Sequence, residues 1–172
     1  MYYAGSSGTL DPGDTAKPVC AGAVIQLGQG VQSSKPAAVG ITPPHITATI
    51  RYAVPADLGN PQLGNVMLVL RYRPGTGRIT AVLNEVPLLY ADPSDPGTVT
   101  ETPLLEFDSA AFAASSVFHT HSVGGPTHAN PKHVLNFTEN AYYIAVTITA
   151  LELAIGEPPA IAAIGVVPWE QF

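Results

Sequence analysis

The chain has 172 residues, which suits one domain of ordinary size with a real hydrophobic core. Only 12% of the residues are charged and 46% are hydrophobic, so the sequence is too apolar to be disordered. Seventeen prolines and sixteen glycines, scattered along the chain, exclude a helical bundle, because proline removes a helix donor and clashes with the preceding turn. Together these features predict an all-β protein with long connections.

The charge pattern excludes several classes of partner. The net charge is −6 and no run of Lys and Arg is present, which argues against nucleic acid. No stretch of about 18 apolar residues is present, so we expect no membrane span. Residues 1–14 lack the basic and apolar regions of a signal peptide, and Cys20 has no second cysteine to pair with. The low charge and the many Thr and Pro residues favour a protein of the extracellular surface or of a virion.

The sequence predicts an N-terminal arm over residues 1–40 and a single β-sandwich domain over residues 41–172. The arm consists mostly of turn and loop material, with one candidate short strand in "AGAVIQLGQGV", residues 21–31. Chain ends of this composition usually fray unless they are tied to something. We therefore expect the arm to dock on its own domain or on a neighbouring copy.

The first strong strand signal is "HITATIRYAV", residues 45–54. Its apolar side chains alternate with polar or small ones, which is typical of a half-buried strand. Next come β-rich runs at 65–73 and 78–90, joined by "PGTG". Two such runs around a short Pro/Gly turn predict a hairpin.

The rest of the chain continues the β pattern. Residues 98–107 predict a further strand, in which Pro103 indicates either a sheet edge or a break, because proline cannot donate to a ladder. Asp108 can cap a short helical turn in residues 108–116, and an irregular segment is the open alternative. Two more strands are expected at 140–153 and 160–169. Seven or eight strands without a long helix predict an antiparallel, jelly-roll-like β-sandwich.

The segments "AYYIAVTIT" and "AIAAIGVV" resemble the last two strands of small jelly-roll modules in bacterial surface and phage-associated proteins, where these two strands pair. "VMLVLRYRPGTGRITAVL" is similar to the central hairpin of those modules. The resemblance covers roughly residues 45–167 and lies in the pattern rather than in a unique motif. It implies an oligomeric, often surface-exposed β-sandwich.

Four of the five histidines lie in "FHTHSVGGPTHANPKH", residues 118–133. His119 and His121 are two positions apart, so on a strand both rings project from one face. His128 or His133 could complete a three-histidine site for a divalent transition metal such as zinc. No carboxylate follows at the spacing found in cupins, however, and the residues that do follow are typical of a turning loop.

Two other interpretations of this window remain open. The histidines could line a polar end-loop, or they could meet their counterparts at a pH-sensitive contact between subunits. Ser115 and Ser116 lie near His119, but no G-x-S-x-G motif precedes them to support a hydrolase.

The sequence favours a non-enzymatic structural subunit that assembles with copies of itself in a surface filament, fibre or virion. The arm could donate a strand to its neighbour. One alternative is a metal-binding protein or metal-dependent enzyme that uses the histidine cluster. A further alternative is a module that binds a glycan or a surface receptor.

Overall fold

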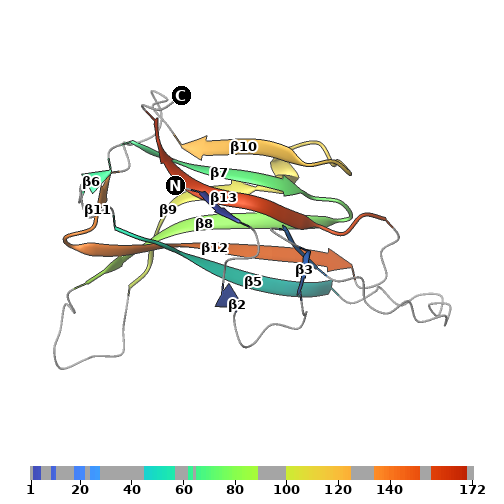
Figure 1. The fold of residues 1–172 in the computed structure, drawn as a ribbon, viewed down its shortest axis with the longest axis horizontal. Coiled ribbons are helices and arrows are strands. Elements are labelled where there is room, and N and C mark those ends of the chain that lie inside the picture. The colour runs from blue at the N-terminus through green and yellow to red at the C-terminus, as the bar shows by residue number, and fades with distance from the viewer. Residues whose placement is uncertain are drawn as a thin grey trace.

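The protein is an all-β, antiparallel sandwich of two sheets (Figure 1). In the described residues of this computed structural model, the one helical element is a short 3-10 turn, η2 (Ser109–Ala111), and no helix is long and apolar enough to cross a membrane. The structure describes residues 2–4, 9–10, 18–21, 24–27, 45–56, 62–63, 65–88, 100–124, 134–151 and 156–169.

Each sheet combines long central strands with short strands from the first 27 residues. The first sheet contains β1 (Tyr2–Ala4), β3 (Pro18–Ala21), β4 (Val24–Leu27), β7 (Val66–Arg73), β10 (His119–Gly124) and β13 (Ala160–Pro168). The second contains β2 (Thr9–Leu10), β5 (His45–Val54), β8 (Gly77–Pro87), β9 (Thr102–Asp108) and β12 (Asn140–Leu151). The short strands β6 (Gln62–Leu63) and β11 (Leu135–Asn136) form a separate pair.

The strand pairing is nested along the chain. β4 pairs with β13, β5 with β12, β7 with β10, and β8 with β9, each time antiparallel. The first four of these eight strands therefore pair with the last four in reverse order. The strand order is β10-β7-β13-β4-β3 in the first sheet and β2-β5-β12-β8-β9 in the second.

The core lies between the sheets and follows the alternation of the sequence. On β5, the residues Ala48, Ile50, Tyr52 and Val54 are buried, while Arg51 between them is exposed. The predicted strand at 45–54 is confirmed with its bounds. Strand β12 contributes a matching buried row, because side chains of period two reach the same face of the sheet.

The predicted hairpin around residues 74–77 is wrong. Both strands exist, but β7 pairs with β10 and β13 in the first sheet, whereas β8 pairs with β12 and β9 in the second. The turn therefore carries the chain from one sheet to the other. Gly75 has a positive φ of 55°, and a Cβ placed there would lie 2.0 Å from the backbone oxygen of Glu157.

The pairing implied by the resemblance is also wrong for the last two long strands. β12 pairs with β5 and β8, and β13 pairs with β7 in the opposite sheet. The chain crosses between the sheets after β12, as it does after β7. Both strands are apolar on the side that faces the core, so either pairing satisfies the local sequence.

Of the two alternatives predicted for Pro103, a sheet edge or a break, the structure shows the edge. β9 is the outermost strand of the second sheet and, among the described strands, pairs with β8 alone. The Asp108 carboxylate then caps η2 by accepting from the Ala110 N–H at 2.9 Å, as the sequence predicts. The same carboxylate is ion-paired with Arg78.

The described parts of the N-terminal arm pair within their own chain. The structure places four short strands there, where the sequence predicted one. β3 and β4 form a hairpin, and β4 joins β13 through two residue pairs. β1 also pairs with β13, and β2 pairs with β5. The arm thus extends one edge of each sheet.

Candidate functional site at the histidine end of the sandwich

Strand β10, at the edge of the first sheet, carries His119 and His121. Their partners on β7 are Tyr72 and Leu70, which point into the core, so both rings lie on the inner side of the sheet. The two ring centroids are 6.1 Å apart and the planes differ by 22°. The histidines therefore share a face, as their spacing predicts.

His121 is half-buried among aromatic side chains. Its Nδ1 shares a hydrogen bond of 3.0 Å with the Tyr72 hydroxyl, and its ring stacks on Phe112 at a centroid distance of 3.9 Å. Phe112 also stacks on Phe107, which meets Tyr72 edge to face at 4.9 Å. Burial raises the pKa of the Tyr72 hydroxyl, so this group stays protonated at neutral pH. His121 is thus part of the packing at the end of the core.

His119 is exposed and contacts the segment that leads into β10. Its Nε2 lies 2.6 Å from the hydroxyl oxygen of Ser115, which also accepts from the Val117 N–H at 3.2 Å. The Ser115 carbonyl accepts from the Gly75 N–H at 3.1 Å. This segment is therefore tied to the turn between β7 and β8.

Arg73, at the end of β7, holds three segments together at the same end of the sandwich. Its guanidinium lies over the Phe118 ring at 5.2 Å and pairs with the Glu157 carboxylate at 2.8 Å. Its Nε also donates to the Pro158 carbonyl at 3.3 Å. The sequence pattern places Arg73 on the same strand face as Arg71 and gives no sign of this role.

The histidine pair can offer two imidazoles to a metal. His128 and His133, the predicted further ligands, lie outside the described residues. Within the described ranges, no group of three His, Cys, Asp or Glu residues is placed to hold an ion. One nitrogen of His119 is engaged by Ser115, and one of His121 by Tyr72. The zinc site stays a prediction that depends on the segment after β10.

The contact between Ser115 and His119 resembles part of a hydrolase site. A working nucleophile also needs a group that orients the histidine and donors for the oxyanion. Among the described residues, the His119 ring bonds to the serine and to no carboxylate. This pair ties β10 to the preceding segment, and we assign it no catalytic role.

Sequence reasoning missed Tyr72 and Phe112, the two neighbours of His121. Tyr72 carried a usable signal, because it lies at period two from Leu70 and Leu68, on the strand face that packs in the core. Phe112 carried none, since its position depends on how the segment after β9 folds back. A buried aromatic strand position opposite a histidine is a sign of structural packing.

Comparison with protein-family models finds no matching family. Comparisons with curated proteins and with solved structures find no match either.

Proposed function

We propose that this protein is a non-enzymatic structural subunit that assembles with copies of itself. The observation that carries the proposal is the pairing of β4 with β13, in which a segment of the arm extends the first sheet through two residue pairs, Ala160 with Gln26 and Ile161 with Ile25. A strand added in this way can come from the same chain or from a neighbour, because the backbone hydrogen bonds are the same.

The chain length between β4 and β5 permits such an exchange. Residues 28–44 provide 17 positions between the end of β4 and the start of β5. Fully extended, 17 residues span at most about 60 Å. A ten-residue strand such as β5 is about 33 Å long. The arm could therefore reach the β13 edge of an adjacent molecule.

We infer further that the sandwich is a jelly roll. The nested pairing, with β4 on β13 and β8 on β9 as its outermost and innermost pairs, supports this interpretation. Jelly rolls consist of eight strands in two Greek keys and are common in capsid proteins and lectins. The low charge of the chain agrees with a subunit of a surface filament, fibre or virion.

Deletion of residues 1–30 tests the proposal, because it removes β1 to β4 and leaves the long strands. We expect the full chain to form oligomers in light scattering and electron microscopy. We expect the truncated chain to stay folded, by circular dichroism, but to form smaller assemblies than the full chain. Assembly of the truncated chain to the same size as the full chain would show that the arm is not the connector.

The shared face of His119 and His121 favours metal binding as a second candidate function. Protein purified without an affinity tag or added metal would then contain a stoichiometric transition metal by elemental analysis. His119→Ala should release it, whereas Thr120→Ala, one position along the same strand, should not. His119 is the better choice for this test because it is exposed, and its removal leaves the contacts of His121 with Tyr72 and Phe112 in place.

A further inference from the structure

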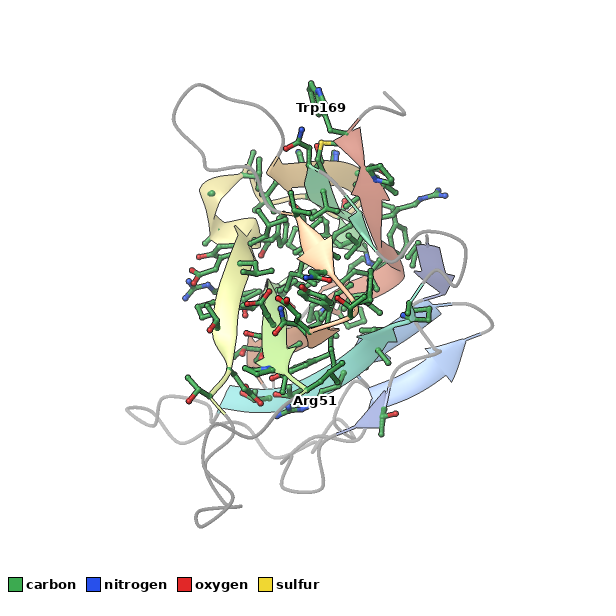
Figure 2. The ribbon with its side chains drawn as sticks, turned by 90° about the vertical axis from the view of Figure 1, so that its left-hand side faces the viewer. Arg51 and Trp169 are labelled. Carbon is green, nitrogen blue, oxygen red and sulfur yellow. The ribbon has the colours of Figure 1, made fainter. Side chains whose placement is uncertain are left out.

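The second sheet has an outer face, on the side away from the core. Figure 2 shows Arg51 on this side of β5, with Trp169 at the opposite side of the molecule. The face is defined by the side chains that alternate with the buried ones on the four long strands: Thr47, Thr49, Arg51, Ala53, Arg78, Thr80, Val82, Glu106, Asp108, Tyr143, Ala145, Thr147 and Thr149.

The centre of this outer face carries short, uncharged side chains. Ala145 on β12 lies beside Val82 on β8, and Thr147 lies beside Thr80. The Thr147 hydroxyl also lies 3.4 Å from that of Thr49 on β5. Short side chains leave this part of the face flat, and a flat surface can approach another sheet to the usual spacing of about 10 Å.

On the four long strands, the two ends of one row across the face carry opposite charges, and Thr9 on β2 continues this row beyond Arg51. Arg51 on β5 pairs in register with Ala145, Ala145 with Val82, and Val82 with Glu106 on β9. Three strand spacings separate the ends of this row, roughly 14 Å. Arg51 and Glu106 are both exposed, so both can contact another molecule.

The position of the Arg51 side chain is set by its neighbours. Its guanidinium lies over the Tyr143 ring at 5.1 Å and 3.9 Å from the Glu101 carboxylate. The Tyr143 hydroxyl in turn donates to Glu101 at 2.5 Å. A cation held in this way loses less side-chain entropy when it meets a second carboxylate.

We propose that two copies pack outer face to outer face about a twofold axis that runs parallel to the strands, between β12 and β8. This operation places Arg51 of each copy opposite Glu106 of the partner subunit, because the two residues lie at equal distances on either side of the axis in the same row. The occupant of the face is thus a second copy of this chain, selected by charge complementarity. The inference rests on the proposed self-assembly and names one interface in it.

Charge reversal in the full chain tests this interface. Arg51→Glu and Glu106→Arg each create two like-charge contacts across the twofold axis, and each should weaken association by at least about tenfold in sedimentation equilibrium. The double variant R51E/E106R restores two opposite-charge pairs and should recover association. Arg71→Glu is the matched control, since Arg71 is exposed on the outer face of the first sheet and its reversal should leave association unchanged.

A second variant tests the same interface without touching Arg51. Val82→Lys places a cation beside the axis of each copy, on an outward-facing, partly exposed position, and should also abolish the pairing. Circular dichroism checks that every variant is folded.

The outcomes separate the two proposals. Oligomers of wild-type size in both single charge variants and in Val82→Lys would overturn this interface and leave self-assembly standing. Failure of R51E/E106R to recover, with both single variants weakened, would overturn the pairing of Arg51 with Glu106. A wild-type chain that stays monomeric at all concentrations would overturn self-assembly and this interface together.

Discussion

Gly75, in the turn that carries the chain between the two sheets, should be one of the least replaceable residues. Its φ of 55° is left-handed, and a Cβ there would lie 2.0 Å from the Glu157 carbonyl oxygen. That oxygen accepts a hydrogen bond of 3.0 Å from the Thr76 N–H. Gly75→Ala must therefore adopt an unfavourable backbone conformation and also displace a bonded carbonyl.

The two costs can be added from the structure. A left-handed conformation costs a residue with a Cβ about 1–2 kcal/mol. Loss of the Thr76 hydrogen bond adds about 1 kcal/mol. We expect Gly75→Ala to lower the free energy of unfolding by about 2–3 kcal/mol, measured by urea denaturation. For a chain of this size the midpoint temperature should fall by roughly 4–12 °C.

Two controls separate the causes. Thr76→Ala leaves the backbone bonds in place and should change the free energy of unfolding by about 0.5 kcal/mol or less. Gly75→Asn tests the conformational part, because asparagine tolerates positive φ, as Asn65 does at 44° in this chain. The clash remains with any Cβ, so Asn should still cost about 1 kcal/mol, which is less than Ala. A Gly75→Ala protein as stable as wild type would refute the reasoning, and a Gly75→Asn protein as stable as wild type would refute the clash.

Three further predictions concern the second sheet. Ile148→Ala, at a fully buried position, should lower the free energy of unfolding by about 2–5 kcal/mol in urea denaturation. Thr147→Ala, on the outer face, should lower it by about 1 kcal/mol or less. Equal effects of the two substitutions would contradict the inward direction of Ile148 and the outward direction of Thr147. The Arg78 guanidinium, hydrogen-bonded to Asp108, lowers the pKa of that carboxyl in the folded protein. The ionised carboxylate therefore stabilises the fold above the pKa of the unfolded state, and this stabilisation is lost as the pH falls through the pKa of the folded state. Asp108→Asn should match the stability of the wild type in acid and be less stable at neutral pH. Burial and the Glu101 carboxylate raise the pKa of the Tyr143 hydroxyl to about 12. The stabilisation by the protonated hydroxyl is therefore complete below about pH 10 and is lost as the pH rises through about 12. Glu101→Gln should lower the pKa of Tyr143 in an ultraviolet absorbance titration, and an unchanged titration curve would contradict the contact between Tyr143 and Glu101.

The alternation of side chains was enough to predict most long strands and their buried faces. Residues 45–54 form the predicted strand, and Pro103 lies on an edge strand as its missing N–H requires. Both features are local, because they depend on the pleat of one strand. The segment after β10 is a different case, since His128 and His133 fall outside the described residues and their role as ligands stays a prediction.

By itself, the sequence determined that this chain is an all-β protein, which residues point inward, and that His119 and His121 share a face. Only the tertiary structure decided which strands are neighbours. Residues 66–73 and 77–87 are equally able to form a hairpin or to enter opposite sheets. Either arrangement requires of each strand only an apolar face toward the core and backbone groups of a neighbouring strand to pair with. The choice depends on β10, β12 and β13, which follow in the chain and supply those partners from a distance.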